Sequence, residues 1–257
     1  MNDHRRVATW GGAILGALLA LGASAYAQVT QPFQRTVSLT ANGRVSLDNI
    51  NGNVEITGWD RNEVAISAVK TANTQQKLDE ARIDVESGAD YVNIATKYPE
   101  GRTNNNPANV NYTLSVPRGA RLEHISLVNG SLTVQHLGGR VEAKLVNGKA
   151  HVSDLAGETD ISGVNGSIEA EYASLSNVQE IKLHSVNGSI ELGLPESPNA
   201  EVTASTMNGG IHTDFPLQVK GEWVGKHLSG TLGSGGTRIE LNNVNGSIHI
   251  GSAHGSL

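Results

Sequence analysis

The side chains that could do chemistry in this 257-residue chain are carboxylates, histidines and serines, because the chain has no cysteine. Asp154, Glu158 and Asp160 form the densest acidic group. Two carboxylates held about 5–10 Å apart are the minimum for cleaving a glycosidic bond. These three fall at an expected turn and on an outward strand face, where solvated carboxylates are ordinary. We therefore expect no catalytic residue, with a polysaccharide-active enzyme as the alternative.

Histidines raise the question of a metal site. Five of the nine fall in expected strand or corner positions: His136, His151, His184, His212 and His249. Zinc needs three or four ligands that converge at about 2 Å. Adjacent strands could bring together His136 with His151, or His212 with His249, but no short-spaced metal motif, calcium-loop pattern, nucleophile elbow or phosphate loop occurs. We expect no metal and no cofactor.

A repeated tripeptide, Val-Asn-Gly or a close variant, sets the elements that carry these side chains. Its Asn-Gly pairs are Asn51-Gly52, Asn129-Gly130, Asn147-Gly148, Asn165-Gly166, Asn187-Gly188, Asn208-Gly209 and Asn245-Gly246. From Asn129 onward the asparagines are spaced by 18, 18, 22, 21 and 37 residues. The last interval is about two units long, and residues 216–238 within it are an insertion or a degenerate repeat.

Each pair is followed by a short segment in which apolar and polar residues alternate, the pattern of a half-buried strand. The inward positions are predicted to be Leu132, Ala150, Ile168, Ile190, Ile211 and Ile248. A second alternating segment lies halfway through each unit, as in Glu180-Ile181-Lys182-Leu183. The sequence thus predicts an all-β fold with two strands and two corners in each unit of about 18–22 residues. The polar stretch 74–81 is the one short helix expected.

Asn-Gly favours tight corners because glycine adopts positive φ without a Cβ clash and asparagine tolerates the left-handed region. Two architectures use such corners. In a hairpin meander each Asn-Gly joins antiparallel neighbours, whereas in a β-solenoid it occupies the same corner of successive coils. The in-register repeat, with a second glycine-marked corner between copies, favours the solenoid. Stacked asparagines could then hydrogen-bond to one another along the axis.

The first 27 residues are typical of a signal peptide, with Arg5 and Arg6 before an apolar run and Ala25-Tyr26-Ala27 at the cleavage site. The remaining residues, 28–257, are predicted to form a single β-repeat domain with an irregular part, 28–120, and regular Asn-Gly repeats, 121–257. After cleavage we expect no stable transmembrane segment. The formal charge of −6 argues against binding to nucleic acid.

The chain resembles the bacterial putative-adhesin family of β-strand-repeat domains, a domain-of-unknown-function family. The resemblance rests on the segment from Asn51 to Asp60, on the step Ser115-Val116-Pro117-Arg118-Gly119-Ala120, and on the later Asn-Gly strands. It covers nearly all of residues 28–257. It implies a solenoid-like surface protein and carries no agreed catalytic residues.

The prediction for function is a non-catalytic exported protein of the cell envelope or surface, periplasmic or secreted. It would be an adhesin-like binding module or structural scaffold for an envelope protein or glycan. Trp59 and Trp223 are the candidate partner-binding residues, and Trp223 lies in the glycine-rich stretch 221–236. Aromatic side chains can anchor a partner. The further alternative is a periplasmic envelope-sensing or regulatory module.

Overall fold

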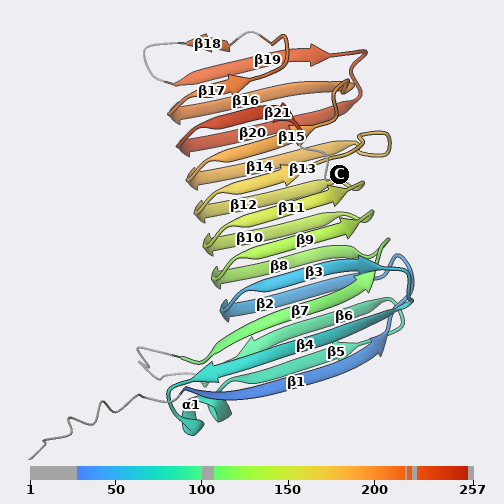
Figure 1. Cartoon of the computed structure of the whole chain (residues 1–257), viewed down its shortest axis with the longest axis vertical. Coiled ribbons are helices and arrows are strands. Elements are labelled where there is room, and N and C mark those ends of the chain that lie inside the picture. Colours follow the sequence, from blue (N-terminus) through green and yellow to red (C-terminus); the bar gives the residue numbers. More distant parts are fainter. Residues whose placement is uncertain (1–27, 100–106, 218, 222–224, 254–257) are drawn as a thin grey trace, which may run out of the picture.

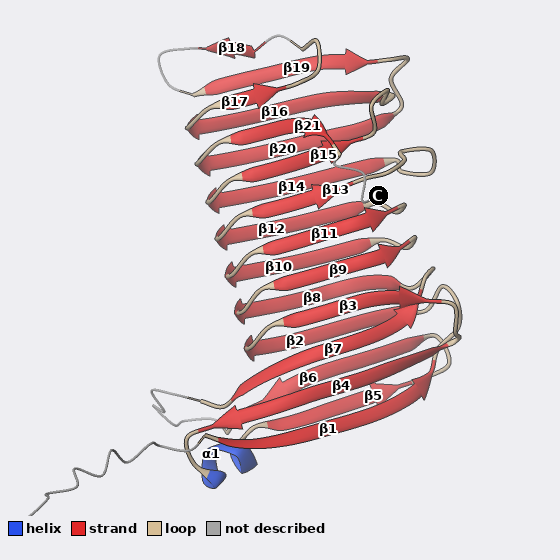
Figure 2. Cartoon of the chain, in the orientation of Figure 1, coloured by secondary structure: helices blue, strands red, loops and turns tan. Residues whose placement is uncertain are grey.

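Two facing β-sheets form a tall stack in the computed structural model, which describes residues 28–99, 107–217, 219–221 and 225–253 (Figure 1). The predicted signal peptide lies outside the described residues. Figure 2 shows strand almost throughout the described chain, with one helix, α1 (Gln75–Glu80), at one end of the stack. In this described part, no helix has the length and apolar character needed to cross a bilayer.

The described strands make two sheets. The first sheet has the order β1 (Val29–Ser38), β4 (Glu63–Ala72), β7 (Asn109–Pro117), β3 (Val54–Trp59), β9 (Leu132–Leu137), β11 (Ala150–Leu155), β13 (Ile168–Glu171), β15 (Ile190–Leu194), β21 (Ile248–Ser252) and β17 (Ile211–Thr213). The second has the order β18 (Val219–Gly221), β19 (Lys226–Leu232), β16 (Ala200–Asn208), β20 (Thr237–Asn245), β14 (Glu180–Asn187), β12 (Thr159–Asn165), β10 (Val141–Asn147), β8 (Arg121–Asn129), β2 (Arg44–Asn51), β6 (Tyr91–Lys97) and β5 (Arg82–Ser87).

In the regular part, each coil consists of one strand of the second sheet, an Asn-Gly corner and one strand of the first sheet. Neighbouring coils pair in parallel and in register, so Asn147 lies beside both Asn129 and Asn165. The all-β, solenoid-like prediction is therefore confirmed, and parallel pairing replaces the hairpin meander. Helix α1 also falls within the predicted stretch 74–81; Thr74 caps it by accepting a hydrogen bond from the Lys77 amide.

The coils do not stack in chain order. The coil β2/β3 lies against β8/β9, although four strands intervene in the sequence. At the other end the last coil, β20/β21, is inserted between β14/β15 and β16/β17. Residues 216–238 are thus an insertion and not a degenerate coil: β19 pairs antiparallel with β16, and β18 pairs antiparallel with β19.

The core lies between the two sheets and consists almost wholly of aliphatic side chains. All six positions predicted to point inward, from Leu132 to Ile248, are buried. Alternation along each strand sends the next residue to solvent, as the burial pattern of β10 shows. Two tyrosines, Tyr112 and Tyr172, are the largest fully buried side chains of the described residues. Burial raises the pKa of Tyr112 to about 12, so its hydroxyl keeps the proton it shares with Thr96 at 2.7 Å.

Close stacking explains the glycine at every Asn-Gly corner. A Cβ on Gly166 would lie 2.0 Å from the carbonyl oxygen of Gly148, and a Cβ on Gly148 would lie 1.9 Å from that of Gly130. The other five corner glycines, Gly52, Gly130, Gly188, Gly209 and Gly246, would meet a backbone oxygen at 1.9–2.2 Å. Five of the seven also have φ between 123° and 159°. The expected positive φ therefore applies to part of the set, whereas the close approach applies to all of it.

The corner asparagines form one continuous ladder of side-chain hydrogen bonds. Along the stack its order is Asn51, Asn129, Asn147, Asn165, Asn187, Asn245 and Asn208. Each amide nitrogen except that of Asn51 donates to the amide oxygen of the preceding asparagine in this order, over distances of 2.8–3.0 Å. In parallel, each corner glycine amide from Gly130 to Gly166 donates to the carbonyl of the next asparagine at 2.9 Å. Backbone and side chain therefore fix the same register.

Both ends of the stack are covered. At one end α1 contacts β1 and β4 (Figure 2), and Leu78 of α1 is fully buried. At the other, Phe215 and Leu217 follow the short edge strand β17 and pack against the core. These contacts close the apolar interior at the two ends of the stack.

Gly166→Val should destabilise the fold by at least about 3 kcal/mol, because it combines left-handed backbone strain with a clash against Gly148. Chemical denaturation would measure this free energy of unfolding. Ser167→Val, one residue further on, is the matched control and should change stability little. Equal effects of the two substitutions would contradict the stacking explanation.

Candidate binding cleft

The edge of the stack opposite the asparagine ladder changes in three consecutive coils. In earlier coils this edge has short connections, 138–140 and 156–158, whose Gly139 and Gly157 stack as closely as the Asn-Gly corners. The next three coils along the stack are entered through 172–179, 233–236 and 195–199. They precede β14, β20 and β16, which are neighbours in the second sheet.

These three loops, here called the cleft loops, enclose a cavity of about 810 Å³. Such a volume is within the range of small-ligand sites, about 300–1,000 Å³. Its lining is mainly polar: hydroxyls of Ser174, Ser176, Ser197, Ser234 and Thr237, amides of Gln179 and Asn199, and the charged groups of Glu158, Glu180, Glu201 and Arg238. The lining contains no aromatic residue.

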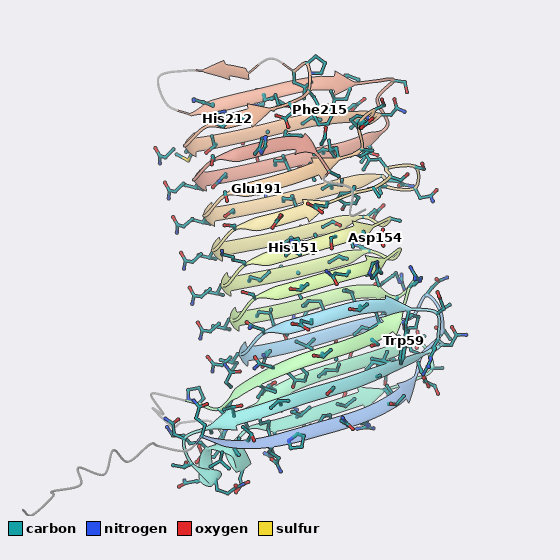
Figure 3. All side chains as sticks on the ribbon, viewed as in Figure 1. Trp59, His151, Asp154, Glu191, His212 and Phe215 are labelled. Carbon is teal, nitrogen blue, oxygen red and sulfur yellow. The ribbon has the colours of Figure 1, made fainter. Side chains whose placement is uncertain are left out.

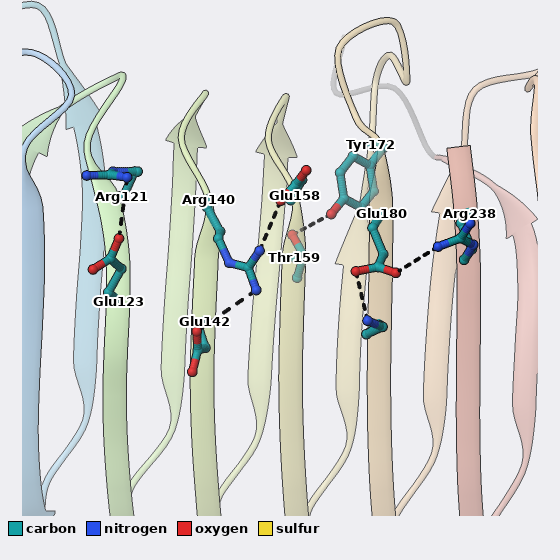
Figure 4. Close-up of polar contacts among 10 residues, drawn as sticks. Arg121, Glu123, Arg140, Glu142, Glu158, Thr159, Tyr172, Glu180 and Arg238 are labelled. Atoms are coloured by element: carbon teal, nitrogen blue, oxygen red, sulfur yellow. Dashed lines mark hydrogen bonds and ion pairs between the residues drawn. The ribbon is translucent and has the colours of Figure 1, made fainter. Parts of the chain in front are cut away.

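Hydrogen bonds tie the cleft loops to one another and to the sheet. Thr237 donates its hydroxyl to the Val178 carbonyl at 2.7 Å, and Ser234 donates both its amide and its hydroxyl to Asn199 Oδ1 at 2.9 and 3.2 Å. Where loop 172–179 begins, the buried Tyr172 hydroxyl donates to Thr159 Oγ1 at 2.5 Å (Figure 4). Burial raises the pKa of Tyr172, so this donor keeps its proton. The cleft is therefore formed before any ligand arrives.

A row of ion pairs borders the cleft along the second sheet (Figure 4). Arg140 pairs with Glu158 at 3.0 Å, and Glu180 pairs with Lys182 at 2.8 Å and Arg238 at 3.6 Å. The hydrogen bond from Lys182, helped by Arg238, holds the pKa of Glu180 below its usual range. Glu180 is thus an ionised acceptor near neutral pH, whereas a general acid needs a raised pKa.

The three carboxylates singled out in the sequence do not converge. Asp154 pairs with His136 at 2.5 Å, both residues having left-handed backbone (φ 50° and 57°) at equivalent places in successive coils. Figure 3 shows Asp154 on the cleft-loop side of the stack. Glu158 is engaged by Arg140, and Asp160 lies on β12 in the second sheet. Each therefore has its own surroundings and no shared reaction centre.

The histidines are likewise dispersed. His151 pairs with Glu169 at 3.0 Å, and His249 pairs with Asp214 at 3.5 Å. The predicted proximity of His212 and His249 holds, since they are register partners on β17 and β21, whereas His136 faces Asp154 and not His151. Within the described ranges, no group of three or more histidine or carboxylate side chains could hold a metal ion.

Of the two candidate partner-binding tryptophans, Trp59 is half-buried at the end of β3 (Figure 3). Its Nε1 donates to the Glu63 carbonyl at 2.9 Å, and the Arg61 guanidinium lies 4.9 Å from the ring centroid. One face of the ring is thus occupied by Arg61. Trp223 lies outside the described residues.

The cleft was not recognised in the sequence. Its signal was present in the asparagine spacings: the increase from 18 to 22 and 21 residues comes from the longer loops 172–179 and 195–199. The third loop, 233–236, lies within residues 216–238, where the sequence indicates an insertion or a degenerate repeat. Only the stacking of β14, β20 and β16 shows that the three loops meet.

Paired coils, stacked corners and an apolar interior define this molecule as a β-solenoid-like repeat protein. Residues 36–251 match the model of the Toastrack DUF4097 family, and the chain belongs to that family. No curated protein matches it.

Solved structures match the chain at low identity. A putative cell adhesion protein from Clostridium sporogenes is 14% identical, with 86% of this chain and 100% of that chain covered and a TM-score of 0.44. A putative adhesin from Bacteroides fragilis is 12% identical over 86% and 97%, with a TM-score of 0.46. A putative lipid binding protein from Parabacteroides distasonis is 14% identical over 85% and 96%, with a TM-score of 0.31.

Tyr172→Phe should cost about 1–2 kcal/mol of stability, because it leaves the buried Thr159 hydroxyl without its donor. Denaturant unfolding measures the loss. Tyr91→Phe is the control, since the Tyr91 side chain is only half-buried. If the two variants unfold alike, Tyr172 does not anchor the start of loop 172–179.

Proposed function

We propose that this protein is an exported, non-catalytic protein of the cell envelope or surface that binds a glycan in the cleft between the cleft loops. The observation that carries the proposal is the cleft itself, where three stacked coils depart together from an otherwise uniform repeat. Loops on a rigid scaffold commonly carry binding function. The cross-links between these loops limit the entropy lost on binding, which favours affinity.

The chemistry of the lining supports a hydroxyl-rich ligand over an apolar one. The Arg238 guanidinium can only donate hydrogen bonds, and its side chain is 70% exposed and so accessible to a ligand. Glu180 and Glu201, which lie on either side of it in the second sheet, can accept. Serine hydroxyls and the Gln179 amide can donate or accept. A sugar presents the same mixture of groups. A protein partner would more often be anchored by an aromatic or apolar pocket, which this cleft lacks.

The binding test uses the full-length chain as purified from a bacterial host, titrated with a panel of envelope glycans and with cell-wall fractions. Arg238→Ala and Glu201→Gln should each weaken binding by about tenfold or more, because hydrogen bonds to charged groups contribute about 1.5–3 kcal/mol. Lys149→Ala, at an exposed residue beside the Asn147-Gly148 corner, is the control and should bind as the parent does. Binding unaffected by the cleft variants, or no retained glycan, would contradict the proposal.

The same purified protein separates the binding reading from the enzymatic alternative. Incubation with acidic polysaccharides should release no new reducing ends. Release that is abolished by Asp154→Ala or Asp160→Ala would show catalysis and overturn the non-catalytic assignment. Unchanged binding by both of these variants is the accompanying expectation, because neither residue lines the cleft.

A further inference from the structure

An exposed apolar column runs along the stack beside the asparagine ladder. Its members are the residues that precede each ladder asparagine: Ile50, Val128, Val146, Val164, Val186, Val244 and Met207, in stacking order. Six of the seven, all but Val244, have exposed side chains, with 37–56% of their surface accessible. Among the described residues, Val69 is the one other large apolar side chain that is exposed. Single exposed valines need no explanation, whereas a continuous column of them does.

A shallow groove lies directly beside this column on the outer face of the second sheet. The valines from Val146 to Val244 form one wall, and Ser126, Lys144, Ser162, His184 and Asn242, two residues earlier in each strand, form the other. The groove has a volume of about 410 Å³. A ridge of apolar side chains and a groove of matching direction are therefore side by side on one surface.

We propose that this column is an interface at which a second copy of the chain docks, with a two-fold axis at the height of Val164 along the stack, between the column and the groove. The first reason is spacing: the column repeats at the strand separation of about 4.8 Å, and a second copy presents the same period. The second reason is shape, since a two-fold axis lets the ridge of each copy enter the groove of the other, as an isologous interface requires.

The order of residue types in the column fits the same symmetry. Val164 is the fourth of seven members, so an antiparallel arrangement pairs Val146 with the partner's Val186 and Val128 with the partner's Val244. The larger end residues, Ile50 and Met207, then meet each other. The asparagine ladder on one side and the polar wall of the groove, which includes Lys144 and His184, on the other provide the polar rim that interfaces usually have.

The area of the contact surface determines how strongly two copies should associate. Six spacings of about 4.8 Å make the column about 29 Å long, and four residues along each strand span about 13 Å. About 400 Å² per copy, which is about 800 Å² in total, lies below the standard size of specific interfaces, so we expect a weak, transient dimer that dissociates in the high micromolar range. The cleft loops lie on the opposite edge and stay open, which gives the dimer two clefts and greater avidity for a repeating ligand.

Crosslinking tests this arrangement cleanly because the chain has no cysteine of its own. Val164→Cys, treated with a short bismaleimide linker, should yield a covalent dimer, since packed sheets lie about 10 Å apart. Val128→Cys alone should give no covalent dimer, because Val128 faces the partner's Val244 in this arrangement. A mixture of Val128→Cys with Val244→Cys should give the covalent dimer. Thr133→Cys, on the outer face of the first sheet, is the control for random collisions.

Sedimentation velocity gives the second measurement. The average mass of the parent chain should rise with concentration, and Val164→Lys should abolish the rise by placing one ammonium group on each side of the axis, within the apolar contact. Thr133→Lys should leave it unchanged. Crosslinking of Val128→Cys alone would overturn the antiparallel two-fold. A monomer at all concentrations, or equal crosslinking by Thr133→Cys, would overturn the interface altogether.

Discussion

The rest of the structure depends on the close approach between backbones at the Asn-Gly corner. Each corner glycine lies so near the carbonyl of the coil beside it that a Cβ would come within 1.9–2.2 Å of an oxygen atom. Glycine permits the contact, and the following strands are then held in register without a register shift from β10 to β14. The asparagine ladder adds a side-chain bond for each step, so a slip by one residue would break both series of hydrogen bonds.

This constraint on one edge leaves the other edge free to vary. Short glycine connections at 138–140 and 156–158 continue the tight stacking, but the longer cleft loops are accommodated with no change in the Asn-Gly corners. Loop insertions in a solenoid accumulate on one face in this way, and that face is often the binding face. The apolar column follows from the constant edge. Because the Asn-Gly corner is the same in every coil, the residue before it also repeats at the strand spacing, and a second copy of the chain has the same repeat.

The periodic features of this fold follow from the sequence, and the long-range ones do not. Alternation after each Asn-Gly pair identified the strands and the inward residues such as Leu132 and Ile190, because period-two burial is a local property. The order of the coils could not be predicted from the sequence, because the copies carry nearly the same tripeptide and no local pattern marks where β20/β21 lies in the stack. For the same reason the cleft was missed: its three loops are far apart in the sequence and meet only because that last coil is inserted beside β14. Trp59 was chosen for its type, whereas its ring contacts with Arg61 and Glu63 depend on the turn after β3.

Native-state hydrogen exchange of individual backbone amides tests the central claim most directly, namely that the corner stack is the fixed part of the molecule and the cleft loops the variable part. The account predicts that the amides of Gly130, Gly148 and Gly166 exchange only through global unfolding, while those in 172–179 and 233–236 exchange earlier through local opening. Corner amides that exchange as fast as those of the cleft loops would contradict it.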